Sequence, residues 1–363
     1  MVAVASVPPI IHEAWAAYGD ERSITATLEL SPHVSTNRVY RLVLSDQRRV
    51  IAKLSSYGSY IHFRQDHELV DQWISLLRGG RFENLLARVL RRGERVFLHR
   101  GTTTVGEPSE GGASVDAWVV FYREEQTRTF LSRVLSDPEI VSLGREIAEF
   151  HKECDQVRHE LRPTWKSLGS DIANLYDALG SASWRAEHNI HSGFEKLLRG
   201  QCDSFLDEAE RLGYPLMHRI PVLIDWNLGN FSVTPAKPGF QLFSRWDYDW
   251  FRIEPRVLDF YFCSRVVGQV GDRTEFSYLV DPLFEQRFQL FLRAYHKVFP
   301  LSENELLFLK ETYRFFILNY VIRLGEHFFA PKIWPRLVQE ALEVHLPQLD
   351  SRDFRNLLPA LDY

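Results

Sequence analysis

Three polar residues follow apolar segments in the middle of the 363-residue chain. The apolar run Pro221–Ile224 leads into Asp225, and Asn230 comes five positions later. A second run, Phe240–Trp246, leads into Asp247. One carboxylate can orient or deprotonate an attacking hydroxyl, while an amide oxygen and a second carboxylate hold a hard cation that bridges phosphate groups. This order of residues indicates metal-assisted phosphoryl transfer.

Each part of this pattern also has a plainer structural interpretation. Asp225 and Asn230 would suit a polar β-turn. Asp247 would suit the capped end of a strand, and Asp249 competes with it as a metal ligand. A single Asp-x-x-x-x-Asn arises by chance in many proteins. The hypothesis therefore depends on the order and separation of several such residues.

The elements that must position these residues change in type along the chain. In the first third, alternating apolar residues predict an antiparallel meander over Ile24–Leu30, Asn37–Leu44 and Arg49–Leu54. A helix over Ile61–Leu77 is expected next. It is followed by a hairpin over residues 86–98 and a strand at Trp118–Tyr122. The first third therefore predicts a small antiparallel sheet with one helix.

Beyond Arg123 the apolar residues follow a helical period. Helices are predicted over Pro138–Lys152, Phe194–Leu212, Glu275–Val298, Glu303–Phe328 and Trp334–Val344. The weakly periodic segment Ser170–Ser192 is expected to be a connector, with a mobile lid as the alternative. The predicted fold class is α+β, with an N-terminal lobe over residues 1–123 and a larger, mainly helical lobe over residues 124–363.

The ordered polar residues resemble those of a known family. The chain is similar to the aminoglycoside phosphotransferase and choline kinase superfamily, whose loop commonly reads His-Gly-Asp-x-x-x-x-Asn before a strand that ends in Asp. The resemblance implies a protein-kinase-like bilobal fold, with Asp225 as the catalytic base and Asn230 and Asp247 as Mg²⁺ ligands. It also implies that Asp259 braces the loop, and the spacing to Asp259 favours Asp247 over Asp249.

The N-terminal third carries segments that match the same family. The run Ser-Thr-Asn-Arg-Val-Tyr that begins at Ser35 resembles the family's phosphate-facing turn. It implies nucleotide contacts at Ser35, Thr36 and Asn37. The strand Val-Ile-Ala-Lys implies that Lys53 holds the α- and β-phosphates. The base of the nucleotide is expected on backbone groups around Tyr122.

The helix after Lys53 should supply a partner for that lysine. The family places a glutamate there, and Glu68 lies at the matching position, with Asp66 and Asp71 as rivals on the same helix. In the larger lobe, the run from Leu143 to His151 is similar to a helix common in the family. The resemblance spans about residues 25–265.

Two departures from the family pattern stand out. Leu223 and Ile224 occupy the positions of the family's His-Gly, which puts the packing beneath the second metal ligand in question. The phosphate-facing turn over Pro32–Asn37 contains no glycine, which restricts how closely its backbone N–H groups can approach a phosphate. These departures motivate an alternative function, a catalytically weak nucleotide-binding protein with a regulatory or binding role.

Composition narrows the other possibilities. A net charge of −5 argues against nucleic acid as a partner. Three separate cysteines fit a reducing compartment rather than a disulfide framework. His151 and Cys154 are two ligands short of a structural zinc site. No apolar stretch of spanning length and no signal peptide is recognisable, so a cytoplasmic monomer or homodimer without membrane contact is expected.

The predicted activity is a small-molecule kinase. The resemblance implies Mg²⁺ and ATP or GTP as cofactors, and a hydroxyl of an amino alcohol, aminoglycoside, homoserine or sugar as acceptor. A protein kinase is the rival enzyme, but the sequence contains no His-Arg-Asp, Asp-Phe-Gly or Ala-Pro-Glu motif.

Overall fold

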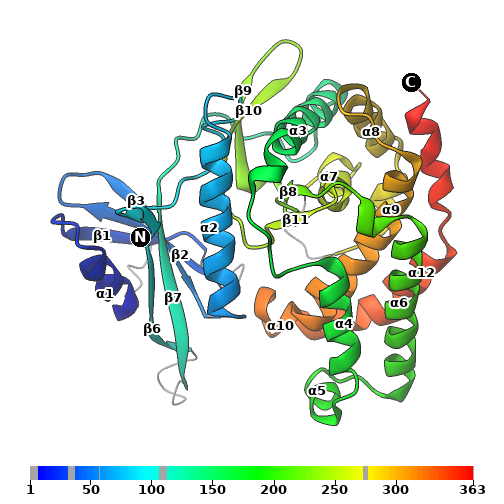
Figure 1. Ribbon diagram of the computed structural model, residues 1–363, viewed down its shortest axis with the longest axis horizontal. Helices are drawn as coiled ribbons and strands as arrows, with labels where there is room; N and C mark the ends of the chain where they lie inside the picture. Colours follow the sequence, from blue (N-terminus) through cyan, green and yellow to red (C-terminus); the bar gives the residue numbers. More distant parts are fainter. Residues whose placement is uncertain (1–6, 32–36, 57, 106–112, 273–276, 363) are drawn as a thin grey trace. The chain divides into compact units, whose positions relative to one another are not determined.

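The computed structural model describes residues 7–31, 37–56, 58–105, 113–272 and 277–362. The chain divides into two compact units. The N-terminal unit comprises Met1–Ser75, Leu86–Gln126 and Glu326–Pro331, and the helical unit comprises Leu76–Leu85, Thr127–Gly325 and Lys332–Tyr363. The α+β class predicted from the sequence is confirmed (Figure 1).

The N-terminal unit is built on a five-stranded antiparallel sheet of order β1-β2-β3-β7-β6. Its elements are α1 (Pro9–Tyr18), β1 (Ile24–Glu29), β2 (Arg38–Leu44), β3 (Arg49–Ser55), α2 (Tyr60–Leu76), β4 (Arg91–Arg92), β5 (Arg95–Val96), β6 (Leu98–Val105) and β7 (Ala113–Arg123). The predicted meander and the predicted helix are present, with bounds that differ by one or two residues.

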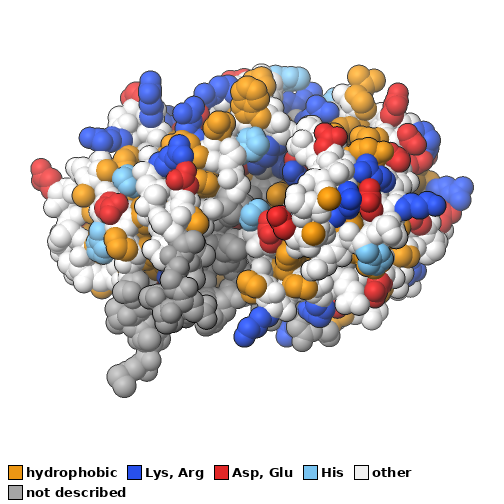
Figure 2. All heavy atoms as spheres, turned by 90° about the horizontal axis from the view of Figure 1, so that it is seen from below, with side chains coloured by type: hydrophobic (Ala, Val, Ile, Leu, Met, Phe, Trp, Pro, Cys, Tyr) orange, Lys and Arg blue, Asp and Glu red, His pale blue; other side chains and the backbone are white. Residues whose placement is uncertain are grey.

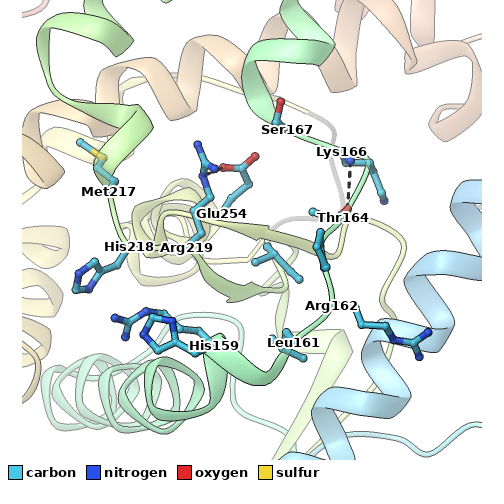
Figure 3. Close-up of a pocket in the computed structure, with 13 residues that line it drawn as sticks. His159, Leu161, Arg162, Thr164, Lys166, Ser167, Met217, His218, Arg219 and Glu254 are labelled. Atoms are coloured by element: carbon cyan, nitrogen blue, oxygen red, sulfur yellow. Dashed lines mark hydrogen bonds and ion pairs between the residues drawn. The ribbon is translucent and has the colours of Figure 1, made fainter.

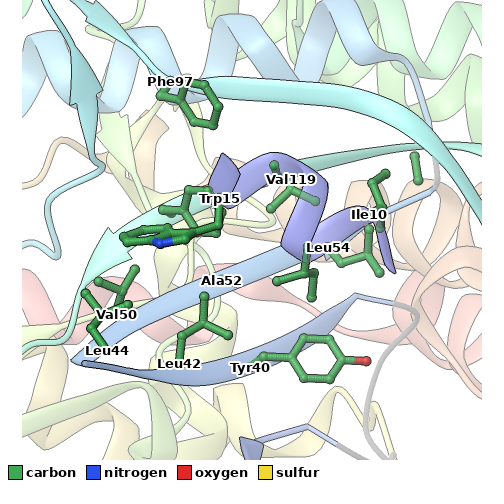
Figure 4. Packing of buried hydrophobic residues seen from close by; sticks show 14 residues of the cluster. Ile10, Trp15, Tyr40, Leu42, Leu44, Val50, Ala52, Leu54, Phe97 and Val119 are labelled. Carbon is green, nitrogen blue, oxygen red and sulfur yellow. The ribbon is translucent and has the colours of Figure 1, made fainter. Parts of the chain in front are cut away.

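Period-two alternation sorts the strand residues onto two faces of this sheet. One face carries the core around Tyr40, Leu42, Val50, Ala52 and Leu54 (Figure 4). Helix α1 covers that core with Ile10, Ile11, Ala14 and Trp15. On the other face, residues of α2 contact β7: the rings of Phe63 and Trp118 lie 5.8 Å apart. The sheet is therefore covered by a helix on each face.

The helical unit contains nine α-helices and two short strand pairs within the described residues, and a tenth helix, α10, begins at Gly325 and continues into the stretch that belongs to the N-terminal unit. The helices are α3 (Asp137–Val157), α4 (Leu168–Ala178), α5 (Ala182–Glu187), α6 (Ser192–Arg211), α7 (Phe260–Val267), α8 (Gln286–Val298), α9 (Glu303–Phe315), α10 (Gly325–Phe328), α11 (Trp334–Glu340) and α12 (Leu346–Ser351). The strand pairs are antiparallel: β8 (Ile220–Val222) with β11 (Arg252–Glu254), and β9 (Phe231–Pro235) with β10 (Phe240–Arg245).

Short helical segments of other geometry join these elements. Those of 3₁₀ type are η2 (Arg158–Glu160), η3 (Tyr214–Leu216), η4 (Leu228–Asn230), η5 (Arg256–Asp259), η6 (Asp281–Phe284) and η9 (Phe354–Leu361). Two are π-helical, η7 (Phe316–Arg323) and η8 (Ala341–His345). No described helix is both long enough and apolar enough to cross a membrane.

Helices α3 and α8 pack closely because of one glycine. A Cβ atom at Gly144 on α3 would lie 2.7 Å from the Phe291 carbonyl oxygen and 3.0 Å from the Ala294 Cβ on α8. Helix α3 begins at a capping box in which Ser136 and Glu139 bond each other's backbone. The cap fixes where α3 starts, and the missing side chain lets α8 approach it.

Several expectations for secondary structure were wrong. Ser170–Ser192 is not a connector: it forms α4 and α5, which start at the N-caps Ser167 and Ser181. The helix expected from Glu275 begins only at Gln286. The long helix expected over Glu303–Phe328 changes to a π-helical segment after Phe315. Helices α1 and α7 and strand β6 were not predicted at all.

Acidic and basic side chains are interspersed over the described residues of the face shown in Figure 2. Such mixing is usual for a solvated protein surface. The Arg91–Arg95 hairpin is exposed, and Arg91 forms an ion pair with Asp71 at 2.6 Å.

Candidate functional site

The two short strand pairs of the helical unit bring the three predicted catalytic-loop residues together. Asp225 comes three residues after β8, and Asp247 comes five residues before its partner β11. Asn230 immediately precedes β9, whose first residue pairs with the last residue of β10, Arg245. Antiparallel pairing thus converts a sequence separation of 22 residues between Asp225 and Asp247 into proximity.

A buried arginine joins the three residues. Arg245 is fully buried, and its guanidinium donates to the carbonyl oxygens of Asp225 at 2.7 Å, Asn230 at 3.3 Å and Asp247 at 2.9 Å. The Asn230 side-chain amide also donates to the Asp225 carbonyl at 3.3 Å. Because one rigid, planar donor group contacts three carbonyls, it fixes the spacing of the backbone on which the side chains stand. Sequence reasoning missed Arg245, since a charged residue in a short strand is usually exposed.

A second buried group holds the start of the loop. The Asp259 carboxylate accepts from the Ile224 N–H at 2.6 Å, from the Trp226 indole at 2.7 Å and from His151 Nε2 at 2.9 Å. The brace predicted for Asp259 is therefore present. His151, on α3, also bonds the Tyr295 hydroxyl of α8 at 2.9 Å. The expectation that His151 and Cys154 are core residues rather than metal ligands fits their complete burial.

The departure at Leu223-Ile224 has a structural counterpart. Ile224 has a φ of 62°, in the left-handed region that favours glycine and is rare for a β-branched residue. The Asp225 N–H donates to the Leu223 carbonyl at 2.7 Å, closing a three-residue turn around Ile224. Asp247 has a φ of 70°. Strained backbone of this kind persists where the surroundings determine it, and it gathers at functional sites.

The Asp225 carboxylate lies in a setting that favours its protonated form. Burial and the nearby Asp247 charge raise the pKa of the Asp225 carboxyl to about 6, against the lowering effects of Arg245 and of the Asn227 N–H. That N–H donates to Asp225 Oδ1 at 3.2 Å and orients the carboxylate. A carboxylate with a pKa near the working pH is suited to accept a proton from a hydroxyl.

The same residues have the chemistry of a Mg²⁺ site. Asn230 supplies an amide oxygen and Asp247 a carboxylate, the oxygen ligands that this cation prefers. Asp247 Oδ1 accepts a hydrogen bond from the Asp249 N–H at 3.2 Å. The backbone of Asp249, the alternative metal ligand, thus helps to orient the Asp247 carboxylate. Among the described residues, no cluster of three or more His, Cys, Asp or Glu side chains has the arrangement of a metal site. Two protein ligands suit Mg²⁺, because it usually keeps waters and phosphate oxygens as its other ligands.

In the N-terminal unit, Lys53 lies in the middle of the sheet. It sits on β3, paired with Val39 of β2 and Val120 of β7, and it is buried. Alternation places it on the face opposite the core of Figure 4, the face on which α2 lies. Lys53 therefore lies on the predicted strand, and its contact with the phosphates stays a prediction.

Two acidic residues of α2, Glu68 and Asp71, form ion pairs with arginines. Glu68 lies 3.4 Å from Arg64, one turn earlier on the same helix, and its side chain is 36% exposed. Its rival Asp71 pairs with Arg91. The structure thus shows Glu68 in a surface ion pair, and the pairing with Lys53 stays a prediction.

The backbone around Tyr122 is partly committed within the N-terminal unit. The Phe121 carbonyl accepts the Leu90 N–H at 2.7 Å, and the Arg123 N–H donates to the Arg88 carbonyl at 2.9 Å. The Tyr122 hydroxyl bonds His67 Nε2 at 2.6 Å. The contact of a nucleotide base with the backbone around Tyr122 stays a prediction.

The structure describes one of the three other residues that were predicted to contact the nucleotide. Ser35 and Thr36 lie outside the described residues. Asn37 is buried at the start of β2, and its carbonyl accepts the Ser31 hydroxyl at 3.3 Å.

Two further groups complete the loop in the helical unit. Asp272 accepts the Leu228 N–H at 2.6 Å, in the middle of the loop between Asp225 and Asn230. Trp226, Tyr248 and Trp250 are buried, so these aromatic residues near the loop belong to the core. Asp272 lies outside any motif recognised in the sequence, so no signal there pointed to it.

No family model matches the sequence, and no curated protein matches it. Solved structures do match over nearly the whole chain. A microcompartment-associated aminopropanol kinase matches with a TM-score of 0.58 at 15% identity, covering 92% of this chain and 94% of that one. The amicoumacin kinase hAmiN, in complex with AMP-PNP, Ca²⁺ and Ami, gives 0.57 at 14% identity, covering 95% and 99%. The gentamicin complex of APH(2")-IIa gives 0.59 at 11% identity, covering 95% and 99%.

The chain has the fold of the aminoglycoside phosphotransferases. The resemblance inferred from Asp225, Asn230 and Asp247 is confirmed at the level of the fold. An aminoglycoside-phosphotransferase fold can carry different acceptors, so the acceptor has to be inferred from the site.

Proposed function

We propose that the protein is a small-molecule kinase that transfers the γ-phosphate of ATP or GTP to a hydroxyl group. The observation that carries the proposal is the Arg245 guanidinium, which ties the backbones of Asp225, Asn230 and Asp247 into one loop cluster. A kinase-like fold supports the same conclusion.

In this proposal each residue has one role. Asp225, with its carboxylate oriented by the Asn227 N–H, accepts the proton of the acceptor hydroxyl. Asn230 and Asp247 hold Mg²⁺, which when bound neutralises charge on the β- and γ-phosphates. Lys53 steadies the phosphates from the N-terminal unit. Most of the rate gain would come from positioning and electrostatics, because phosphoryl transfer demands little covalent chemistry from the protein.

The acceptor would approach Asp225 from the helical unit. A pocket of about 290 Å³ lies beside the loop and is lined by Phe130, Leu131, Arg133, Leu228, Gly229 and Asp272. Its size suits a small alcohol, and its lining offers both an acidic and a basic group. Amino alcohols, aminoglycosides, homoserine and sugars remain the classes to screen.

The deciding test is a thermal shift with Mg²⁺ and ATP or GTP, on wild type, Asp247→Ala and Lys53→Met. A ligand that binds only the folded state raises the melting temperature according to its occupancy. We expect a Mg²⁺-dependent rise that Asp247→Ala removes and that Lys53→Met reduces. No rise with either nucleotide would overturn the proposal. A rise without phosphoryl transfer to any hydroxyl would favour the catalytically weak nucleotide-binding alternative.

A further inference from the structure

A pocket of the helical unit lies away from the candidate catalytic loop. It has a volume of about 550 Å³ and is formed by the segment from η2 to the start of α4, the residues before β8 and the end of β11 (Figure 3). Arg219 precedes β8 and Glu254 ends β11, whereas Asp225 follows β8 and Asp247 precedes β11. The pocket and the loop are therefore at opposite ends of one strand pair. The volume falls in the range of small-molecule sites.

The lining of this pocket is strongly basic. Its titratable residues are one acid, Glu254, and six basic side chains, Arg158, His159, Arg162, Lys166, His218 and Arg219. The chain as a whole has a net charge of −5, so this concentration of positive charge runs against the average. In Figure 3, Arg162 extends away from the central Arg219–Glu254 pair, while His159 and His218 lie on one side of it.

Two carboxylates lie close to three of these basic groups. Asp155 accepts a hydrogen bond from Arg158 and lies 3.7 Å from His218 Nδ1. Glu254 lies 3.7 Å from Arg219 Nε. Asp155 is thus shared between Arg158 and His218, and Glu254 is the carboxylate beside Arg219. Burial also raises the pKa of the Glu254 carboxyl to about 7, which reduces its negative charge at neutral pH.

Arg219 is held in place with unused donor capacity. Its guanidinium lies over the Tyr214 ring, 4.9 Å from the centroid, and the Tyr214 hydroxyl bonds Glu254 at 2.9 Å. Within the described part of the chain, the buried Arg219 Nε atom has no hydrogen-bond partner. Glu254 is in turn fixed by the Leu168 N–H at 2.8 Å. A planar guanidinium that is pre-oriented and incompletely bonded suits an oxyanion.

Apolar residues stand in the chain next to the lining residues. Trp165, between the lining residues Thr164 and Lys166, is 75% exposed. Leu216, directly before the lining residue Met217, is 88% exposed. Neither side chain is among those that line the pocket.

We propose that this pocket binds a phosphate-class oxyanion, either free phosphate or the phosphate group of a small molecule, through Arg219 and Arg158 with support from His218. The site is separate from the candidate nucleotide site, and the inference does not rest on the proposed kinase activity. The pocket volume exceeds what one phosphate fills, which favours a phosphate monoester over the free ion.

Titration calorimetry at constant ionic strength, without Mg²⁺ or nucleotide, tests the site. The probes are inorganic phosphate and phenyl phosphate, with sodium chloride as the blank. We expect wild type to bind phenyl phosphate more tightly than phosphate, and the double variant Arg158→Gln/Arg219→Gln to bind both at least tenfold more weakly.

The control variant is Arg211→Gln, which removes an arginine that is paired with Glu208 at the end of α6. It should bind like wild type. If the double variant fails to fold, Arg158→Gln and His218→Gln replace it, and each should weaken binding severalfold. Absence of binding at millimolar phosphate and phenyl phosphate would overturn the proposal. So would binding that the pocket variants leave unchanged but Lys53→Met abolishes, since the anion would then occupy the nucleotide site.

Discussion

In the N-terminal unit, Lys53 is held by regular backbone pairing on both sides, because β3 lies between β2 and β7. In the helical unit, Asp225 and Asp247 stand on irregular backbone with positive φ angles nearby, held by the side chains of Arg245 and Asp259. Pairing between neighbouring strands positions Lys53 through many backbone hydrogen bonds. The loop that carries Asp225 and Asp247 depends instead on a few buried polar side chains. The two halves of the candidate machinery should therefore respond very differently to single substitutions.

The largest effect is expected at Asp225. Asp225→Asn keeps the acceptor oxygen for the Asn227 N–H but removes the proton acceptor, so the turnover rate should fall by about 10²–10⁴-fold. Nucleotide affinity, measured by calorimetry, should stay within about twofold of wild type. A variant that turned over at nearly the normal rate would show that Asp225 is not the base.

Removal of the Asp259 carboxylate should destabilise the helical unit. Asp259→Ala leaves three buried donors, on Ile224, Trp226 and His151, without their acceptor, which should cost about 3–5 kcal/mol. The control is Glu29→Ala on β1, which loses a partly exposed ion pair with Arg38 and should cost less than about 1 kcal/mol. Urea unfolding measures both. Equal losses of unfolding free energy in the two variants would contradict the proposed difference between the strand-paired region and the loop.

A smaller loss is expected where α3 meets α8. Gly144→Ala places a methyl group 2.7 Å from the Phe291 carbonyl oxygen, and the resulting shift should cost about 1–3 kcal/mol. Gly200→Ala, inside α6 with no atom within 4 Å of the added Cβ, should instead stabilise by up to about 1 kcal/mol. Calorimetric melting distinguishes the two, and a neutral Gly144→Ala would mean that α8 can move away without loss.

The pH dependence should reveal the carboxylate of Asp225. With its pKa raised to about 6, turnover should fall as the pH drops below that value, because the protonated form cannot accept a proton. The native state keeps this proton to a higher pH than the unfolded chain, whose value is near 3.8, so stability from this group is lost as the pH rises from about 4 to about 6. Asp225→Asn should therefore melt above wild type at pH 7 and approach it at pH 4. A constant difference would exclude this assignment.

The same difference between strand pairing and side-chain hydrogen bonding explains which features could be predicted from the sequence. Alternation in Arg38–Leu44 and Arg49–Ser55 predicted the strands and the place of Lys53, because period-two burial is a local signal. Strand β6 was missed because its run of threonines lacks that alternation.

The residues that hold the loop, Asp259 and Arg245, were harder to recognise in the sequence. Asp259 was found through the spacing of a family motif, but Arg245 resembles any surface arginine until β9 and β10 pair. Helices α4 and α5 escaped notice because their apolar faces are short, although Ser167 and Ser181 are N-cap residues. Long-range polar contacts leave little trace in one sequence, and here they position the candidate loop.

The hydrogen bond from the Ile224 N–H to Asp259 makes the opening of the loop measurable by hydrogen exchange. Ile224 is 1% exposed, so its amide proton can exchange with solvent only when that bond opens and the strained turn relaxes. Its exchange rate would report how often the candidate base leaves its working position. A ligand that tightens the loop would slow this single amide more than the amides of β3, which exchange only when the sheet itself opens.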